Sequence, residues 1–416
     1  MVQQYRCPAM LSHSTHSPTE VLVMNSGSSS LKFSLIDHST EEVRVQGLAE
    51  SLGTPDAVLH LSRVGREKEI YGIPNAGHSQ AIATVIDQID GSRIGAVGHR
   101  VVHGGEAFSG SIRINPAALA AIRHCVPLAP LHNPANLAGI EAAIERFPAL
   151  PHVAVFDTAF HQTMPRHAFL YAIPHAFYEE HKVRRYGFHG TSHRFVSAEA
   201  ARLLGKDPAD LQLITAHLGN GCSACAVKGG LSVDTTMGLT PLEGLVMGTR
   251  SGDVDPNLHQ FLAAALGKSL DEITAILNRE SGLLGLSGLS NDMRQLAEAA
   301  DQGHSRARLA IEVFCYRLAK GLLALAAGLD RIDAVVFTGG IGENSAAVRE
   351  KTLSHLRILG PVLDAQLNAK HGRESGGSIT GPDSRLLALV IPTNEELVIA
   401  REAARFLDHS INPPSR

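Results

Sequence analysis

The chain has 416 residues, a length at which one hydrophobic core has stopped growing, so two domains are expected. Its residues are 44% hydrophobic and 19% charged, which fits a folded globular protein and excludes a disordered one. The net charge of −4 excludes the broad basic surface that nonspecific nucleic-acid binding needs. No apolar stretch reaches the roughly 18 residues of a membrane-spanning helix.

Residues 1–19 contain Ser, His and Pro but a single Arg and no apolar core of the kind found in signal peptides. We expect them to form a disordered extension, with the organised chain beginning at Glu20.

The five cysteines are odd in number and show no regular spacing, which favours a reducing cytoplasm. Cys222 and Cys225 form a lone CxxC in a strand-like run, which we interpret as structural rather than as a metal or redox site.

An apolar run, a polar turn and a second apolar run follow one another twice in the chain, a pattern that predicts strand, turn, strand. The first copy is Val21–Met24, Asn25–Ser30 and 31–35, and the second is Leu213–Ala216, His217–Gly221 and Cys222–Val227. A recurrence over so long an interval indicates two related halves rather than a short-period solenoid.

Helix and strand signals alternate through the rest of the chain. Asn115 and Asn133, each before a Pro, predict helix N-caps. A long helix is predicted over Arg306–Ala327 with Ser305 as its N-cap, and a last helix over Glu395–Leu407 with Asn394 as its N-cap. Further buried strands are predicted at Ile94–Val101, His152–Phe156 and Asp333–Phe337. This alternation predicts α/β layers with ligands at the carboxyl ends of the strands.

Three turns of small residues follow predicted strands: Asn25–Ser30, His217–Gly221 and Gly339–Glu343. Such turns leave backbone N–H groups accessible and let a phosphate approach closely. One such turn is most often an ordinary hairpin, but three suggest a nucleotide held between two domains, with Lys32 beside the first turn. No GxxxxGK[ST] motif occurs, which excludes a Walker-type loop.

Two arginines and an aspartate stand at predicted strand ends. Arg100 and Arg250 are flanked by glycines, and the arginine fork suits a carboxylate or a phosphate. Asp157 ends a hydrophobic strand, which makes it a candidate site residue by position. The chain has 22 histidines, so an isolated His carries little weight, and no HExxH or similar metal-ligand spacing appears.

Taken in order, these segments resemble the acetate kinase family, within the wider group that includes sugar kinases, actin and heat-shock chaperone ATPases. The resemblance extends from about Val21 to Leu407, whereas residues 1–19 and the CxxC are peculiar to this chain. Nine ordered motifs carry it: 25–32 (NSGSSSLK), Gly98–Glu106, Pro130–Pro134, Phe156–His161, Gly187–His193, His217–Gly221, Gly248–Asp253, Gly339–Asn344 and 392–396 (PTNEE).

The resemblance implies an α/β fold of two ribonuclease-H-like (actin-like ATPase) domains with a duplicated core and the active site in the interdomain cleft. The N-terminal domain would comprise residues 20–160 plus a returning C-terminal helix, 395–410. The nucleotide-binding C-terminal domain would comprise residues 161–394. The resemblance also implies a homodimer that acts on small molecules, while the cysteines favour the cytoplasm and the charge and hydropathy argue against nucleic-acid and membrane partners.

The implied reaction is the reversible transfer of the ATP γ-phosphoryl to acetate, which gives acetyl phosphate and ADP and depends on Mg²⁺, with Mn²⁺ as an alternative ion. By resemblance, Asn25 and Glu395 form the metal site, and the catalytic residues are Asp157, Arg250 and His189, the last donating to the transferring phosphoryl. Arg100, Val102, Leu131, His132, Phe188 and Pro241 would bind the acid. Lys32, His217, Leu218, Gly219, Asn220 and Gly221 would contact phosphates, and Asp292, Met293, Arg294, Gly339, Gly340, Ile341, Gly342 and Glu343 would hold adenosine.

Physical chemistry agrees with these roles. A carboxylate is already deprotonated at pH 7, so its activation needs no general base. Repulsion between the two anionic reactants opposes the reaction, and Arg100, Arg250, His189 and the metal ion would relieve it. We therefore interpret Asp157 as an orienting residue for an arginine or for metal-bound water rather than as a proton acceptor.

The acid pocket implied by the resemblance is apolar, and Val102 in it favours a methyl group, so we expect propionate to be a poorer substrate. A propionate or butyrate kinase with the same machinery is the nearest alternative. A binding protein switched by ATP would give Arg100 and Arg250 no function. A sugar kinase would need a general base and a polar pocket, whereas the positions beside Arg100 are apolar. The physiological direction stays open from the sequence, as does GTP or pyrophosphate as the donor.

Overall fold

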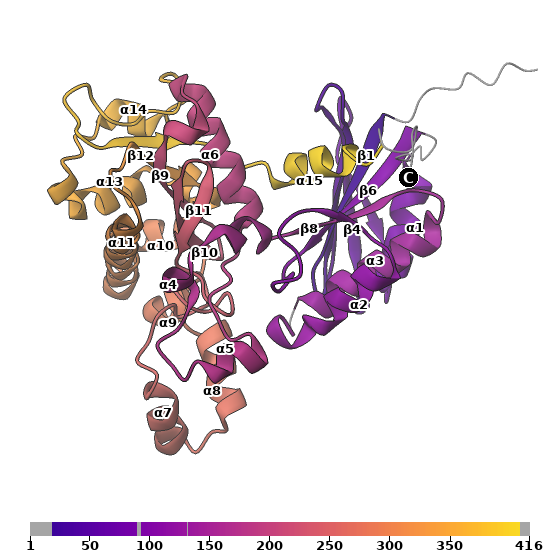
Figure 1. Cartoon of the computed structure of the whole chain (residues 1–416), viewed down its shortest axis with the longest axis horizontal. Coiled ribbons are helices and arrows are strands. Elements are labelled where there is room, and N and C mark those ends of the chain that lie inside the picture. Colours follow the sequence, from indigo (N-terminus) through magenta and orange to yellow (C-terminus); the bar gives the residue numbers. More distant parts are fainter. Residues whose placement is uncertain (1–18, 90–92, 131, 408–416) are drawn as a thin grey trace, which may run out of the picture.

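The structure, a computed structural model, describes residues 19–89, 93–130 and 132–407. The chain folds into two lobes, each built on one mixed β-sheet (Figure 1). Residues 1–18 of the predicted extension, Leu131 and residues 408–410 of the predicted last helix lie outside the described residues. No helix in the described ranges is long and apolar enough to cross a membrane.

The first lobe contains an eight-stranded sheet and the second a five-stranded sheet. The first sheet consists of β1 (Glu20–Ser26), β2 (Leu31–Asp37), β3 (Val43–Glu50), β4 (Val58–Arg63), β5 (Glu69–Gly72), β6 (Ile94–Val101), β7 (Ile112–Arg113) and β8 (His152–Phe156). The second consists of β9 (Gln212–Leu218), β10 (Cys222–Lys228), β11 (Leu231–Thr235), β12 (Ala334–Thr338) and β13 (Leu387–Val390). The strands predicted from the sequence are confirmed within one or two residues.

The two sheets share one topology. The spatial order β3-β2-β1-β6-β8 in the first lobe corresponds to β11-β10-β9-β12-β13 in the second. In each lobe the hairpin strands are antiparallel, β1 with β2 and β9 with β10. The next strand pairs in parallel with the first of them, β6 with β1 and β12 with β9. This equivalence confirms the α/β fold with a duplicated core.

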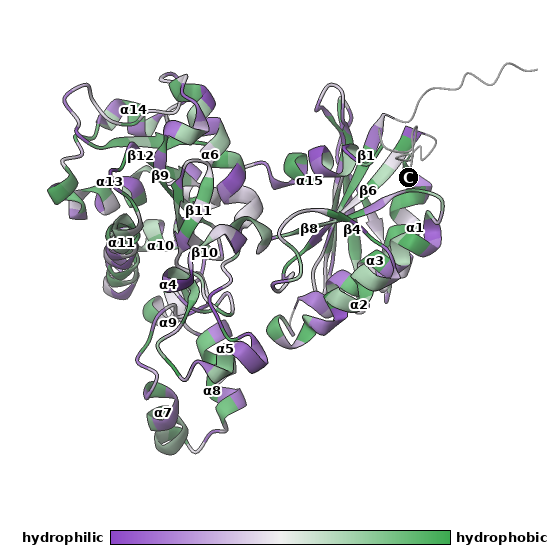
Figure 2. Ribbon diagram, in the orientation of Figure 1, coloured by the Kyte–Doolittle hydropathy of each residue, from purple (hydrophilic) through white to green (hydrophobic). Residues whose placement is uncertain are grey.

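The structure has helices on both faces of the sheets and, in the second lobe, helices that lie away from the sheet (Figure 1). In chain order they are α1 (His78–Gln88), α2 (Pro116–His124), α3 (Asn133–Arg146), α4 (Arg166–Phe169), α5 (Ala176–His181), α6 (Gly190–Leu204), α7 (Leu258–Leu266), α8 (Leu270–Arg279), α9 (Gly282–Ser287), α10 (Met293–Asp301), α11 (Ser305–Leu325), α12 (Gly339–Asn344), α13 (Ala346–His355), α14 (Ala365–Ala369) and α15 (Glu395–Ala404). Most of them carry hydrophobic and hydrophilic residues side by side in Figure 2, as helices with one buried face do.

The helix α15, which follows the whole second lobe in the sequence, packs on the first lobe (Figure 1). Successive side chains of β1 point to opposite faces of the sheet. Leu22 and Met24 therefore join the core under α1 and α3, while Val21 and Val23 join a cluster with Ile399 of α15. Close packing also depends on Gly98 of β6, because a Cβ there would lie 2.6 Å from the Ile399 Cγ2.

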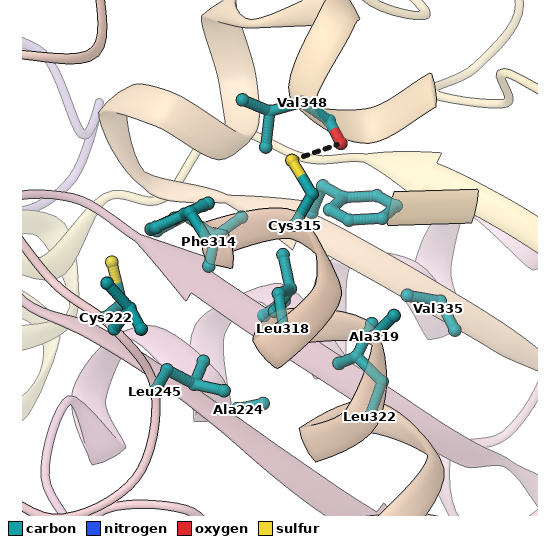
Figure 3. Close-up of a cluster of buried hydrophobic side chains, with 14 of the residues drawn as sticks. Cys222, Ala224, Leu245, Phe314, Cys315, Leu318, Ala319, Leu322, Val335 and Val348 are labelled. Atoms are coloured by element: carbon teal, nitrogen blue, oxygen red, sulfur yellow. Dashed lines mark hydrogen bonds between the residues drawn. The ribbon is translucent and has the colours of Figure 1, made fainter. Parts of the chain in front are cut away.

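The second lobe is built in the same way. One face of its sheet packs against α6, and the other packs against α10, α11 and α13. Figure 3 shows the latter core, in which the Cys315 thiol of α11 donates to the Val348 carbonyl at 3.8 Å. Cys222 and Cys225 of the CxxC are buried free thiols whose pKa values burial raises to about 12, so they take part as packing groups.

Three sequence-based helix boundaries need correction. Asn133 is not an N-cap: it lies inside α3, and its amide instead pairs with the backbone of His103. Ser305 is the first residue of α11, and the preceding His304 caps the helix through Nδ1. Asn394 does cap α15, but the helix ends at Ala404 rather than at Leu407. The N-cap predicted at Asn115 is confirmed.

Candidate active site

The predicted site residues lie at the carboxyl ends of strands in both sheets. Arg100 is near the end of β6 and Asp157 follows β8, while Asn25 is near the end of β1. In the second lobe His217 is near the end of β9 and Gly339 follows β12. Parallel neighbours end at the same edge of a sheet, so each lobe contributes one group of polar side chains.

Arg100 and Asp157 form a bidentate ion pair. Arg100 Nε donates to Asp157 Oδ1 at 3.0 Å, and Nη2 donates to Oδ2 at 2.6 Å. The third nitrogen, Nη1, lies 3.5 Å from Asn25 Oδ1. Asp157 is only 1% exposed, so the whole carboxylate is desolvated and committed to the arginine.

A second carboxylate, Glu395, lies close to this pair. Burial alone would lower the pKa of Arg100, but the charges of Asp157 and Glu395 raise it above its ordinary value and keep the guanidinium charged. Burial raises the pKa of Asp157, and the charge of Arg100 opposes that rise. Because both Asp157 oxygens accept from N–H groups of Arg100, we describe the two residues as an ionised pair. Glu395 Oε1 is a buried oxygen with no hydrogen-bond partner in the described ranges.

Arg250 reaches the same region from the second lobe. Its Nη1 donates to the Pro241 carbonyl at 2.8 Å, which fixes the guanidinium. A Cβ on Gly221 would lie 2.7 Å from Arg250 Nη2 and 3.4 Å from His189 Nε2, so Gly221 makes room for both side chains. Burial lowers the pKa of His132, and the charges of Arg250 and Arg100 lower it further, whereas the charge of Asp157 raises it.

The backbone conformation and the ring contacts of His189 together fix the position of its side chain. It adopts a left-handed conformation with φ of 56°, a strained geometry for a residue other than glycine, directly before α6. Its Nδ1 lies 2.9 Å from the Ser223 hydroxyl, and its ring stacks on His217 with centroids 4.3 Å apart. Burial lowers the pKa of His189 well below its usual range, and His217 and His193 lower it further, so the ring is neutral.

The turn His217–Gly221 is compact and tied to its surroundings. The Gly219 N–H donates to the Gly221 carbonyl at 3.0 Å, which closes the turn. His217 Nδ1 pairs with Ser192 Oγ at 2.8 Å, and the Ser192 hydroxyl lies at the same distance from Thr393 Oγ1. Burial lowers the pKa of His217 to about 4, so this turn meets the site without a positive charge of its own.

The segment after β12 is a short helix, α12, rather than a loop. Gly339 has φ of 74°, and a Cβ there would lie 2.9 Å from the backbone of Leu218, so β9 and α12 pack without a side chain between them. Glu343 Oε1 accepts from the N–H groups of Gly339 at 2.9 Å and Thr393 at 3.1 Å. This carboxylate joins α12 to the segment that leads back to the first lobe.

The other end of α12 is capped by a buried arginine from α13. Arg349 Nη1 donates to the carbonyls of Gly342 at 2.8 Å and Glu343 at 3.0 Å, which satisfies acceptors left open at the helix end. Its Nε and Nη2 donate to Asn368 at 2.9 and 2.7 Å. The side chain is fully buried, and burial lowers its pKa to about 10.

Apolar side chains adjoin the arginines. Val102 and Phe188 are buried and belong to one hydrophobic cluster, while Pro241 is half-buried and contacts Arg250. Leu131, predicted for the same pocket, lies outside the described residues.

Three residues predicted to contact nucleotide are engaged in surface ion pairs. Lys32 pairs with Glu396 of α15, and Arg294 pairs with Asp292, its Nη2 lying 2.6 Å from Oδ2. Asp292 also caps α10, and Arg294 is largely exposed. Both arrangements leave charged groups at the surface of the site.

The chain was compared with known proteins over its whole length. A family model described as the acetokinase family matches residues 20–401. The chain belongs to the acetokinase family. Members of this family are phosphotransferases, and the sequence-based resemblance is thereby confirmed.

Relatives and solved structures agree with this assignment. An acetate kinase from Deinococcus radiodurans is 59% identical over 387 residues, which cover 92% of this chain and 97% of that protein. The crystal structure of a propionate kinase from Francisella tularensis is 46% identical, with a TM-score of 0.89 and coverage of 93% and 99%. That of Porphyromonas gingivalis acetate kinase is 43% identical, with a TM-score of 0.87 and coverage of 94% and 100%.

Several residues that build this acetokinase-family site were not singled out from the sequence. Asn136 accepts from the Val102 N–H at 3.0 Å and donates to the Ser26 carbonyl at 2.7 Å, which joins the ends of β1 and β6. Arg185 donates to three successive carbonyls, 235–237, and pairs with Glu243, which fixes the segment before Pro241. An Asn on a helix or an Arg beside another Arg gives no sequence signal, because both are common at surfaces.

Proposed function

We propose that this chain is an acetate kinase that transfers the γ-phosphoryl of ATP to acetate, reversibly, giving acetyl phosphate and ADP. The observation that carries the proposal is that Gly221 leaves room for Arg250 Nη2 and His189 Nε2 beside each other in the second lobe, while Arg100 is held by Asp157 at the strand ends of the first lobe. Apolar Val102 and Phe188 lie beside them. Curated relatives that are 52–59% identical and are named acetate kinase support acetate as the acid.

The chemistry requires charge relief rather than a base. An acetate oxygen attacks the γ-phosphorus, and the bond to the oxygen that bridges the β- and γ-phosphates breaks, leaving its electron pair on ADP. Both reactants are anions, so the half-buried guanidinium groups of Arg100 and Arg250 would stabilise the charge that accumulates between them. His189 would donate to a γ-phosphoryl oxygen. Asp157 is already bound to Arg100 through both oxygens, which supports an orienting role.

We place a divalent cation, Mg²⁺ or Mn²⁺, at Asn25 and Glu395. The residues fit such an ion, because Glu395 Oε1 is buried without a hydrogen-bond partner in the described chain and Asn25 offers an amide oxygen. The described residues contain no cluster of three or more His, Cys, Asp or Glu side chains suited to a metal ion. This agrees with Mg²⁺, which is usually bound through one or two carboxylates together with substrate phosphates. When bound, the ion would neutralise phosphate charge.

We assign the nucleotide to the second lobe. Apart from the Gly219 N–H, which closes the turn, the N–H groups of His217–Gly221 would face phosphates, with Lys32 approaching from the first lobe. Asp292, Met293 and Arg294 would border adenosine together with Gly339, Gly340, Ile341, Gly342 and Glu343. The exposed Asp292–Arg294 pair supports a place at the mouth of such a site.

The acid would lie between Arg100 and the apolar residues Val102, Phe188 and Pro241, with His132 and Leu131 beside it. A pocket of this kind accepts a methyl group and disfavours larger chains by about 1–3 kcal/mol per methylene. Propionate should therefore be a real but poorer substrate, although one solved relative is named a propionate kinase.

We further propose two domains, residues 20–160 with 395–410 and residues 161–394, with the site between them. A homodimer would explain α7, an apolar helix none of whose nine residues is buried. Phe261 on it is 70% exposed, and Leu266 and nearby Leu270 are exposed as well. The free thiols in the described chain support a reducing compartment such as the cytoplasm.

The test is to trap acyl phosphate with hydroxylamine after incubating the purified chain with ATP, Mg²⁺ and acetate, propionate or butyrate. We expect hydroxamate only when all components are present, with kcat/KM falling from acetate to butyrate. A higher kcat/KM for propionate would overturn acetate as the substrate. ATP hydrolysis without hydroxamate from any acid would overturn the carboxylate as the acceptor.

A further inference from the structure

A chain of buried hydrogen bonds lies behind His189. His189 Nδ1 is 2.9 Å from Ser223 Oγ, and the same hydroxyl is 2.8 Å from His193 Nε2. His193 Nδ1 is in turn 2.7 Å from Thr215 Oγ1. Ser223, His193 and Thr215 are fully buried, so no solvent water completes these bonds.

The chain can be satisfied in two directions. Ser223 has one proton and lies between two ring nitrogens, so it donates to one ring and accepts from the other. If it donates to His193, then His193 donates to Thr215, and both rings carry their protons on Nδ1. If it donates to His189, then Thr215 donates to His193, and both rings carry their protons on Nε2.

The hydrogen-bond distances at Thr215 favour one of the two directions. In the first, the Thr215 hydroxyl must donate to the Cys225 carbonyl at 3.5 Å, a distance too long for a good O–H···O bond. In the second, the Thr215 hydroxyl donates to His193 at 2.7 Å, and each of the three bonds is 2.9 Å or shorter. A buried hydroxyl without a good acceptor is destabilising, which favours the second direction.

We propose that Ser223, His193 and Thr215 are positioning residues that hold His189 as a neutral imidazole with its proton on Nε2. That nitrogen lies on the side of Gly221 and Arg250, away from Ser223. A neutral Nε2–H donates to a phosphoryl oxygen, whereas the opposite tautomer would present a lone pair to an anion. This inference rests on the proposed function for its consequence, but the tautomer itself is independent of it.

The surroundings of His189 oppose the other way of making a donor, which is to protonate the ring. His193 lies behind it on α6 and His217 stacks on it from β9, while the Arg100 charge acts from β6 and the Arg250 charge from the second lobe. A positive His189 would be repelled by both arginines. The hydrogen-bonded chain of Ser223, His193 and Thr215, which we call the relay, gives His189 an Nε2–H donor without adding that charge.

The direct test is 15N NMR of the full-length chain labelled at histidine, without substrates. His189→Gln identifies the His189 signals by their disappearance. We expect wild-type His189 to show a protonated Nε2 and an unprotonated Nδ1. A protonated Nδ1 would overturn the proposal even if the enzyme phosphorylates acetate; conversely, the expected tautomer in a chain without kinase activity would contradict only the proposed function.

Two variants test the relay. Ser223→Ala removes the proton that His189 Nδ1 accepts, and Thr215→Val removes the far hydroxyl at nearly constant volume. We expect each variant to populate both tautomers of His189 and to lower kcat. For Ser223→Ala the fall in kcat should be roughly 10-fold, which is less than the ~10²–10³-fold loss typical of deleting such a donor outright. Thr215→Ser should restore the wild-type NMR pattern. An unchanged tautomer in Thr215→Val would overturn the relay even if Ser223→Ala fails to fold.

A neighbouring pair provides the matched control. His161 Nδ1 lies 2.8 Å from Ser232 Oγ, but its Nε2 is 3.0 Å from the Phe188 carbonyl, which only accepts. The carbonyl therefore fixes the proton of His161 on Nε2 whatever Ser232 does. Ser232→Ala also removes a buried hydroxyl from a histidine in this lobe, and it should leave the tautomers of both His161 and His189 unchanged. A tautomer change at His189 in this variant would show that general loosening, not the relay, sets the proton.

Discussion

Arg100 donates to both carboxylate oxygens of Asp157, and the two residues lie at the carboxyl ends of the adjacent parallel strands β6 and β8. Because Asp157 is committed to Arg100, it should act by orienting the guanidinium. We expect Asp157→Asn to keep much more activity than Asp157→Ala, since the amide oxygen still accepts from Arg100. Steady-state kcat over a range of pH is the measurement. An Asn variant as inactive as the Ala variant would indicate that Asp157 accepts a proton.

Arg250 should act mainly on the transition state. We expect Arg250→Ala to lower kcat by ~10²–10³ while the fold is kept, because one preorganised donor to the phosphoryl is lost. Arg250→Lys should recover little, since an ammonium cannot both donate to Pro241 and face the phosphoryl in the geometry of a fork. Circular dichroism checks the fold. Near-normal kcat for the Ala variant would remove Arg250 from the catalytic residues.

Val102 should set the length of the acid. Val102→Ala enlarges an apolar site by about two methyl groups, so the propionate-to-acetate ratio of kcat/KM should rise by roughly 10-fold, given about 1–3 kcal/mol per methylene. Val85→Ala is the matched control, because Val85 is also a buried valine, in α1, but belongs to a different core. It should lower stability and leave the ratio unchanged. A ratio that does not move in Val102→Ala would mean that other residues limit the acid.

Arg349 should connect the stability of the second lobe to nucleotide affinity. Arg349→Met leaves the carbonyls of Gly342, Glu343 and Asn368 without their donor, at about 1–3 kcal/mol for each buried group. We expect a lower Tm and a higher KM for ATP, with kcat less affected. Arg357→Met, which alters an exposed arginine, should change neither quantity. If only Tm falls, the helix end does not influence the nucleotide.

Acidification should destabilise the fold through buried neutral histidines. Burial lowers the pKa values of His103, His161 and His217 to about 4, below the ordinary value near 6.5 of an unfolded chain. Between these values the unfolded state binds more protons, so stability rises with pH across the window and is lost as pH falls, by about 1.4 kcal/mol per unit for each group. Urea unfolding at several pH values measures the slope. His161→Gln should reduce it, and an unchanged slope would contradict this assignment.

Strand positions were readable from the sequence because short apolar runs ended at glycine- and asparagine-rich turns. The duplicated hairpins β1–β2 and β9–β10 followed from that pattern alone. Asp157 was found by position, as a charge at the end of a buried strand. The N-cap predicted at Asn133 was wrong for a physical reason. The Asn133 amide forms hydrogen bonds with the backbone of His103 instead of with the backbone of its own helix.

Residues whose role depends on distant partners could not be found in this way. Ser223 lies inside the CxxC and reads as a small strand residue, yet it bridges His189 and His193, which precede it by 34 and 30 residues. Arg349 reads as one of many charged helix residues, although it is fully buried. Only the folded chain brings such donors and acceptors together.

The position of α15 has a consequence for how the protein is made. Ribosomes deliver the eight strands of the first sheet early, but the helix that covers Val21, Val23 and Ala96 is synthesised only after the second lobe. Until Ile399 and its neighbours leave the ribosome, one face of that sheet is an open apolar surface. We therefore expect the nascent first lobe to be prone to aggregation until α15 is synthesised. A truncation before residue 395 should leave the same surface bare permanently and give an aggregating chain.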